Sequence, residues 1–270
     1  MRSSHLASLA LAAASLIVSA SAAAKPWKGA EMVSQQTFKY GAFEARLVAA
    51  RGGGIITPFF LYKNGSEVPG AEWEEMDFEI FGRDNVTSFQ SQIMTPGDPR
   101  TEHVELHQEP FSLANGYHTY RMEWTPTRLS FYFDGTLIRQ ETDTDEYAKL
   151  MLDDRAEPMT LRVSVWAGDS EWSGAFDSTA VPAHVFVSYV RYEQYTPGSG
   201  PSGSDFTEAW QDNFASYDGS RWYGANWTFD AAINDYVPDN STVRDGYLTN
   251  SFTDEQNLGY SGPIPIDPDR

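Results

Sequence analysis

Short stretches of alternating apolar and polar residues recur along the chain. The alternation is clear over Phe43–Val48, Met76–Phe81 and Leu161–Trp166, and a period of two indicates a strand with one buried face. Helical periodicity is scarce, and 144–154 is the segment that favours a helical turn or two. Repeated short strands with turn residues between them predict an all-β fold, a sandwich or a barrel.

Two segments carry stronger strand signals. Residues 128–141, RLSFYFDGTLIRQE, place Asp134-Gly135 between two strand-like halves, and this dipeptide favours a two-residue hairpin turn. Residues 184–195, HVFVSYVRYEQY, read as one long strand. Gly52-Gly53-Gly54 follows a strand-like run without a phosphate-loop pattern, so it predicts a β-turn.

A polar segment at 196–204, TPGSGPSGS, interrupts this pattern. Its composition predicts a flexible linker, which usually separates two domains. The following 66 residues, 205–270, are few for an independent core, and the chain has no cysteine that could form a disulfide to stabilise them. The alternative is that this tail supplies strands to the first domain.

The N-terminus predicts export. Residues 1–27, MRSSHLASLALAAASLIVSASAAAKPW, combine Arg2, a short apolar run and small residues. This pattern is typical of a secretory signal peptide, here 1–24 with cleavage before Lys25. No second apolar run of membrane-spanning length follows. We therefore expect a soluble protein outside the cell or in the periplasm, with no membrane partner.

Charge and composition narrow the partners. The formal net charge is −19, which argues against nucleic acid, because phosphate binding needs a basic patch. A neutral polymer fits better than an acidic one. The 8 Trp and 14 Tyr residues are expected to be mostly core, with the remainder free to serve as platforms for sugar rings.

The stretch EWEEMDFEIFG, 72–82, holds the most informative chemistry. Side chains of a strand alternate between its faces, so Glu75, Asp77 and Glu79 share one face and the apolar residues between them share the other. A retaining glycosidase needs one ionised and one protonated carboxyl group about 5–5.5 Å apart. Since the outer pair has Cα atoms roughly 13 Å apart in a strand, its long side chains would have to lean inward.

Two other interpretations of this stretch stay open. The face could be an acidic surface in contact with water, which Glu72 and Glu74 nearby support. It could also be a calcium site, because hard cations prefer carboxylate oxygens.

Other candidate motifs are weaker. His103 and His107 flank Glu105 on one face of a predicted strand, which would permit a metal, but the spacing is not that of a zinc protease helix. No nucleophile-elbow motif supports Ser-His-Asp catalysis. Structural roles are the simpler interpretation for these histidines.

The acidic stretch resembles the active-site motif of glycoside hydrolase family 16, Glu75-x-Asp77-x-Glu79 followed by Gly82 and preceded by Trp73. Its uninterrupted spacing is similar to that of licheninases, the 1,3-1,4-β-glucanases. Further matching segments, in order, are YGAFEARL (40–47), FFLYKNGSE (59–67), SFQSQ (88–92), GYHTYRMEWTPTRLSFYFDG (116–135) and LRVSVW (161–166).

The tail also resembles part of a licheninase, but in the wrong place. DFTEAWQDNFASYDGSRW followed by NWTFD is similar to the opening of an ordinary licheninase and here comes last. The chain is thus similar to circularly permuted bacterial members of the family. This resemblance implies one domain over 25–270, with 196–204 joining the permuted segments. Residues 253–270 match nothing in it and, being rich in Pro and Asp towards the end, are expected to fray.

The resemblance implies a concanavalin-like jelly-roll β-sandwich, a monomer, with an open cleft on its concave sheet. It implies a secreted enzyme that hydrolyses mixed-linkage β-glucan, such as lichenan or cereal β-glucan, by double displacement. Glu75 would be the nucleophile, Glu79 the acid/base and Asp77 the carboxylate that tunes them. No catalytic cofactor is expected, although members often hold a structural calcium ion, whose ligands here are unknown.

The same resemblance assigns residues to glucan binding. They are Glu31, Phe60, Tyr62, Asn64, Trp73, Gln90, Gln92, Arg162, Ser164, Trp166 and Trp227.

Two of these positions depart from the family pattern, since relatives carry Asn where this chain has Gln92 and Ser164. Specificity rests on a few hydrogen bonds, so a 1,3-β-glucanase or an exopolysaccharide-cleaving relative stays an alternative. A non-hydrolytic β-glucan-binding protein is the alternative from another class.

Overall fold

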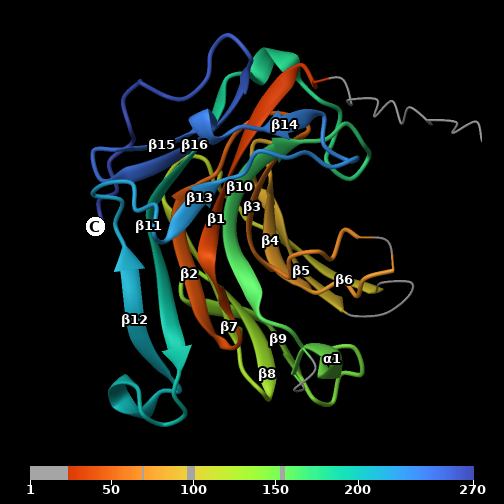
Figure 1. Ribbon diagram of the computed structural model, residues 1–270, viewed down its shortest axis with the longest axis vertical. Coiled ribbons are helices and arrows are strands. Elements are labelled where there is room, and N and C mark those ends of the chain that lie inside the picture. The colour runs from red at the N-terminus through yellow and green to blue at the C-terminus, as the bar shows by residue number, and fades with distance from the viewer. Residues whose placement is uncertain (1–23, 69, 96–100, 153–155) are drawn as a thin grey trace, which may run out of the picture.

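The computed structural model describes residues 24–68, 70–95, 101–152 and 156–270. The described chain is built almost wholly from β-strands that form two facing layers (Figure 1). The predicted signal peptide lies outside the described residues except for Ala24. In the part described, no helix has the length and apolar character needed to cross a membrane.

The first sheet is antiparallel between its neighbouring main strands. Its order is β6 (Thr101–Gln108), β5 (Ser88–Thr95), β4 (Glu75–Phe81), β3 (Ile55–Tyr62), β10 (Met159–Ala167) and β1 (Trp27–Phe38). The short strands β13 (Trp222–Gly224) and β14 (Asn234–Tyr236) pair with β1.

The second sheet packs against the first and is also antiparallel. Its order is β9 (Thr136–Thr142), β8 (Arg128–Phe133), β7 (His118–Trp124), β2 (Gly41–Val48), β11 (Ala183–Tyr195) and β16 (Tyr247–Asp254). β12 (Phe206–Asp212) pairs with β11, and β15 (Ser241–Arg244) pairs with β16. A short pairing of β16 with β1 joins the layers into one curled sheet.

Helical turns are short and lie in the connections. They are α1 (Lys149–Leu152) and the 3-10 turns η1 (Ser178–Ala180), η2 (Pro201–Gly203) and η3 (Pro238–Asn240). The helical turn predicted within 144–154 is therefore confirmed by α1.

The core lies between the two sheets and follows from the alternation. Met76, Phe78 and Ile80 of β4 are fully buried. The Phe78 ring lies 5.3 Å, centroid to centroid, from both Tyr120 and Phe131 of the second sheet. Burying a side chain of this kind stabilises the fold by roughly 2–3 kcal/mol. The predicted all-β sandwich is confirmed.

The predicted hairpin at 128–141 is also confirmed. β8 and β9 pair in antiparallel register around Asp134 and Gly135, whose φ angles are 45° and 75°. Positive φ at both central residues is the geometry of the turn that matches strand twist. The turn could be predicted from the sequence because Asp and Gly tolerate this backbone conformation.

The C-terminal segment contributes strands to both sheets. β12 extends the second sheet beside β11, and β16 lies between β11 and β1. Trp222 and Phe252 from this segment are buried in the shared core. The tail therefore supplies strands to the first domain.

The segment 196–204 is an ordered loop between the antiparallel neighbours β11 and β12. Thr196 N donates to Asp205 O at 2.7 Å and Gly200 N donates to Ser204 O at 2.9 Å. The predicted linker thus connects two paired strands of one sheet, and composition does not reveal that pairing.

The contacts of residues 253–270 contradict the expectation that this segment frays. β16 continues to Asp254, and Asp267 is only 4% exposed. Arg46 Nε and Nη2 donate to Asp267 Oδ2 and Oδ1 at 2.7 and 2.9 Å, and Tyr117 OH donates to Pro265 O. This segment, although rich in Pro and Asp, is held in place because Arg46 on β2 pairs with Asp267. The local sequence does not show this pairing.

We expect Asp267→Asn to destabilise the protein by about 3 kcal/mol, because it removes the buried carboxylate that pairs with Arg46 and leaves that charge only the exposed Asp269. Burial raises the pKa of Asp267, but the hydrogen bonds that its carboxylate accepts, above all from Arg46, and the Arg46 charge together outweigh burial and hold that pKa below its usual range. Urea unfolding measures the loss. The control is Asp269→Asn, which removes an exposed partner of the same arginine and should cost less than about 1 kcal/mol; equal losses in the two variants would contradict the prediction.

Candidate active site

Three carboxyl groups line the outer face of β4, which we call the carboxylate face. Asp77 is 1% exposed, while Glu75 and Glu79 are half-buried. The neighbouring strand β5 places Gln92 opposite Asp77 and Gln90 opposite Glu79. The predicted sharing of one strand face by the three acids is thus reproduced.

Each carboxyl group has a different hydrogen-bond donor. Trp73 Nε1 donates to Glu75 Oε2 at 2.7 Å. Gln90 Nε2 donates to Glu79 Oε2 at 3.0 Å, and Gln92 Nε2 donates to Asp77 Oδ2 at 3.3 Å. The acids therefore stand in distinct environments although they are spaced evenly along one strand.

Crowding and burial shift the protonation of two of these acids. Burial first, and then the charges of Glu75 and Glu102, raise the pKa of Glu79 to about 8. Burial, followed by the charges of Glu79 and Glu75, raises the pKa of Asp77 well above its usual range. Asp77 Oδ1 is buried without a hydrogen-bond partner among the described residues, so ionising Asp77 would leave an unsatisfied charged oxygen.

These shifts refine the role expected of Asp77. Burial and the charges of Glu75 and Glu102 keep the pKa of Glu79 high, and the charge of Asp77 is not among these causes. The arrangement keeps a protonated carboxyl group beside neighbours that cannot all ionise together.

Arg162 organises a hydrogen-bonded group on β10 and β1, next to the carboxylate face. Its Nη1 donates to Glu31 Oε1 at 2.8 Å, and its Nη2 donates to Asn64 Oδ1 at 2.6 Å. The guanidinium carbon lies 4.4 Å from the Tyr62 ring centroid and 5.5 Å from that of Trp227. Burial raises the pKa of Glu31, and the charge of Arg162 partly offsets this.

Aromatic rings border the carboxyl groups on both sides. Tyr62 packs edge-on against Trp73 at 5.7 Å, and its hydroxyl donates to Glu67. Trp166 stacks on Trp172 with 5.9 Å between ring centroids and 22° between planes. Flat apolar rings beside polar hydrogen-bonding groups suit a sugar, which has apolar faces and hydroxyl edges.

The structure brings the sequence-predicted residues into two connected groups. One contains Glu75, Asp77, Glu79, Trp73, Gln90 and Gln92. The other contains Arg162 with Glu31, Phe60, Tyr62, Asn64 and Trp227. Ser164 is adjacent to Glu31 in register, and Trp166 follows on the same strand.

Two residues of this region were missed by the sequence analysis. Trp172 Nε1 donates to Gln90 Oε1 at 3.1 Å, and the Tyr236 hydroxyl lies 3.0 Å from Ser164 Oγ. Trp172 follows Trp166 by six residues, and this closeness to a predicted site residue is the signal that could have found it. Tyr236 gave no signal, because only the pairing of β14 with β1 brings it here.

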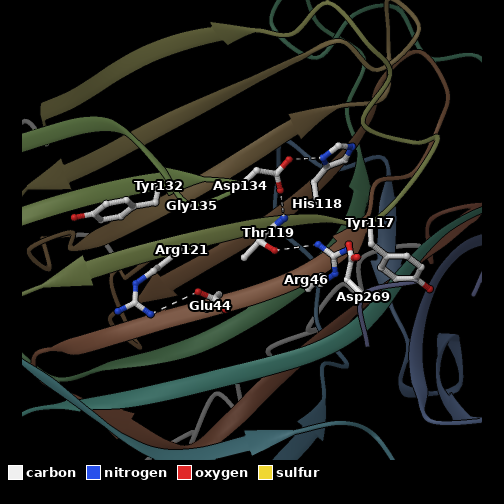
Figure 2. Close-up of a pocket in the computed structure, with 10 residues that line it drawn as sticks. All are labelled: Glu44, Arg46, Tyr117, His118, Thr119, Arg121, Tyr132, Asp134, Gly135 and Asp269. Atoms are coloured by element: carbon white, nitrogen blue, oxygen red, sulfur yellow. Dashed lines mark hydrogen bonds and ion pairs between the residues drawn. The ribbon is translucent and has the colours of Figure 1, made fainter. Parts of the chain in front are cut away.

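A separate hollow of about 570 Å³ lies on the outer face of the second sheet (Figure 2). Its charged side chains are paired with one another: Arg121 with Glu44, and His118 with Asp134. It is lined mainly by β2, β7 and β8, with Asp269 from the C-terminal segment, and does not include the carboxylate face.

The candidate metal residues have structural partners. His103 stacks on Tyr147 at 3.5 Å, His107 Nε2 lies 2.9 Å from Ser91 Oγ, and Glu105 lies 3.7 Å from Arg139. Within the described ranges, no group of three or more His, Asp or Glu side chains is arranged to hold a metal ion. The structural calcium implied by the resemblance stays a prediction, and no chemical step below depends on it.

Fold and site together define a β-sandwich glycoside hydrolase. Comparison with known proteins then places the chain: it belongs to the glycosyl hydrolases family 16, whose family description matches residues 5–191. Enzymes of this family need no catalytic cofactor.

Individual relatives carry the name β-glucanase. The chain is 37% identical to a β-glucanase of Fibrobacter succinogenes over 262 residues, 96% of this chain and 73% of that protein. It is 31% identical to a β-glucanase of Bacillus subtilis over 161 residues, 59% of this chain and 60% of that protein. Among solved structures, Bacillus licheniformis β-glucanase aligns with a TM-score of 0.51 at 30% identity, covering 60% of this chain and 70% of that one.

Proposed function

We propose that this chain is a secreted retaining endo-β-glucanase that hydrolyses mixed-linkage 1,3-1,4-β-glucan. The observation that carries the mechanism is the split between two carboxyl groups on one strand. Glu79 is held protonated to about pH 8, while Glu75 accepts a short hydrogen bond from the Trp73 indole. A retaining glycosidase needs such a protonated acid beside a carboxylate nucleophile.

In the proposed reaction, a Glu75 carboxylate oxygen attacks the anomeric carbon while Glu79 gives its proton to the departing glycosidic oxygen. The carbon–oxygen bond to the leaving chain breaks as the bond to Glu75 forms. Glu79, now ionised, takes a proton from water, whose oxygen displaces Glu75 from the sugar. Asp77 lies between the two glutamates on the same strand face, where burial and their charges raise its pKa.

The proposed substrate class rests on the carboxylate face and on the relatives. Arg162, Glu31 and Asn64 form a fixed hydrogen-bonding group beside the rings of Tyr62 and Trp227. Such a surface suits the hydroxyl edges and apolar faces of neutral sugars. The relatives reported above are named β-glucanases, which favours β-glucan among neutral polymers.

We also propose that the chain order is permuted and that the protein is exported as a monomer. The relative from Fibrobacter aligns over almost the whole chain, whereas the relative from Bacillus aligns over 161 residues, as a permuted order would produce. Export rests on the signal-like N-terminus, and N-terminal sequencing of the secreted protein should give Lys25 as the first residue.

A substrate panel tests the proposed function. Reducing ends should be released from lichenan and cereal β-glucan much faster than from laminarin or xyloglucan. NMR spectra recorded early in the reaction should show the β-anomer of each new reducing end, because double displacement retains configuration. Preference for laminarin would favour the 1,3-β-glucanase alternative, and tight binding without product would favour the non-hydrolytic one.

The pH dependence of kcat/KM should show an alkaline limb near pH 8. Glu79 must carry a proton to act as the acid, and its raised pKa keeps that proton through neutral pH. Above about pH 8, activity should fall about tenfold per pH unit as the free enzyme loses this proton. A rate that stays level to pH 10 would contradict the assignment of Glu79.

A further inference from the structure

A line of side-chain hydrogen bonds begins at Trp172 and ends at two of the three carboxyl groups. Trp172 Nε1 donates to Gln90 Oε1 at 3.1 Å. Gln90 Nε2 donates both to Glu79 Oε2 at 3.0 Å and to Gln92 Oε1 at 3.1 Å. Gln92 Nε2 then donates to Asp77 Oδ2 at 3.3 Å. We call Trp172, Gln90 and Gln92 the amide relay.

The direction of every bond in the relay is set by its first member. An indole nitrogen can only donate a hydrogen bond, so the Gln90 carbonyl oxygen must face Trp172. The Gln90 amino group must then face Glu79 and the Gln92 oxygen, which in turn aims the Gln92 amino group at Asp77. One indole N–H thus orients two amides so that both offer donors to carboxyl groups.

Trp172 is held firmly enough to do this although it is 38% exposed. Its ring stacks on Trp166 and meets the edge of Phe81 with centroids 5.3 Å apart. The loop that carries it is closed by reciprocal hydrogen bonds between Ser170 and Ser173. The position of its N–H is therefore determined by packing on β4 and β10.

Charges near Glu79 disfavour its ionised form, and the hydrogen-bond donors of the amide relay counteract this effect. Glu75 on the same strand and Glu102 on β6 both disfavour its ionised form, and neighbouring Asp77 is itself buried and acidic. On β3 the residue opposite Glu79 is Pro58, which has no charge. On β5 its partner is Gln90, which favours the ionised form by donating a hydrogen bond.

We propose that Trp172 is a positioning residue that acts through Gln90 on the acid/base Glu79, and that the amide relay stabilises the Glu79 carboxylate formed when its proton passes to the leaving oxygen. Trp172 itself transfers no proton. This inference rests on the proposed function, because it takes Glu79 as the acid/base. Without the indole donor, the Gln90 amide is free to turn its oxygen towards Glu79, and it then accepts from the protonated acid instead of donating to the carboxylate.

The test is Trp172→Phe, which keeps an aromatic ring and removes the N–H. A hydrogen bond to a charged group is worth roughly one pKa unit or more. The alkaline limb of kcat/KM should therefore move up by about one pH unit, and kcat on glucan should fall roughly tenfold. The fall in kcat should vanish with a dinitrophenyl β-glucan oligosaccharide, whose leaving group needs no protonation.

A second variant and a control distinguish the loss of the hydrogen-bond donor to Glu79 from a loss of packing around Trp172. Gln90→Met removes the donor to Glu79 while keeping side-chain length, and should move the limb in the same direction. Trp227→Phe alters another indole on the carboxylate face, beside Arg162 and outside the relay; it should raise KM and leave the limb unmoved. Limbs unmoved in both Trp172→Phe and Gln90→Met, or an equal fall in kcat for both leaving groups, would overturn the proposal.

A direct titration keeps this test independent of the glucan assignment. In protein labelled with ¹³C at the glutamate carboxyl carbons, the Glu79 signal is identified by its absence in Glu79→Gln. Its midpoint in the free protein should rise by about one pH unit in Trp172→Phe. If that midpoint rises while wild-type protein hydrolyses no β-glucan, the positioning of Glu79 stands and the proposed function fails; an unchanged midpoint in an active enzyme overturns the relay alone.

Discussion

Glu75→Gln should lower kcat on lichenan by a factor on the order of 10⁴ or more, because an amide cannot form the glycosyl-enzyme. The substitution preserves the shape of the side chain, and its neighbour Trp73 can still donate to the amide oxygen. The melting temperature should therefore stay close to that of the wild type. Turnover by a reducing-end assay and thermal unfolding together measure this result.

Two controls make the result specific to the nucleophile. Glu72→Gln removes an exposed acid three residues away and should leave kcat unchanged. Sodium azide should restore turnover to Glu75→Ala and give the α-glycosyl azide, because a small anion then attacks from the side that the nucleophile occupied. If Glu75→Gln degrades lichenan at the wild-type rate, the assignment of Glu75 fails.

Deleting residues 205–270 should abolish cooperative folding. The deletion removes β16 from between β1 and β11 and strips large buried side chains from the core, among them Phe214, Trp222, Leu248 and Phe252. Each loss of this kind costs roughly 2–5 kcal/mol, so the four together cost about as much as the roughly 5–15 kcal/mol that stabilises a typical domain. Circular dichroism should show no thermal transition for the truncated chain.

The matched control breaks the chain without removing residues. Ser202 and Gly203 lie exposed in the loop between β11 and β12. Co-expressed fragments 25–202 and 203–270 should therefore associate and recover activity. A truncated 25–204 protein with normal melting and activity would show that the tail is a separate module.

The strand pattern and the acidic motif could be predicted from sequence because both depend on local spacing. Met76, Phe78 and Ile80 had to face one side once β4 was a strand, and this placed Glu75, Asp77 and Glu79 together on the other. The turn at Asp134-Gly135 was predictable for the same reason, since the backbone conformation is favoured by those two residues themselves.

Features that depend on distant partners could not be predicted in this way. Tyr236 reaches Ser164 only because β14 pairs with β1 more than 200 residues earlier in the chain. The order of the last residues depends on Arg46, which receives Asp267 across an even larger separation. The raised pKa of Glu79 required knowledge of its burial and of Glu102 on a strand that local spacing does not place beside it.

The position of β1 has a consequence for how the protein is made. This strand pairs with β10 near the middle of the chain, and Lys28 pairs with Thr253 close to its end. Contacts between residues so far apart slow folding, because the long chain segment between them must lose conformational entropy before the contacts can form and stabilise the fold. The edge of β1 that faces away from β10 stays unpaired until β13, β14 and β16 have been synthesised. A chain that stops before β13 would therefore expose an unpaired strand edge, which favours association with other chains.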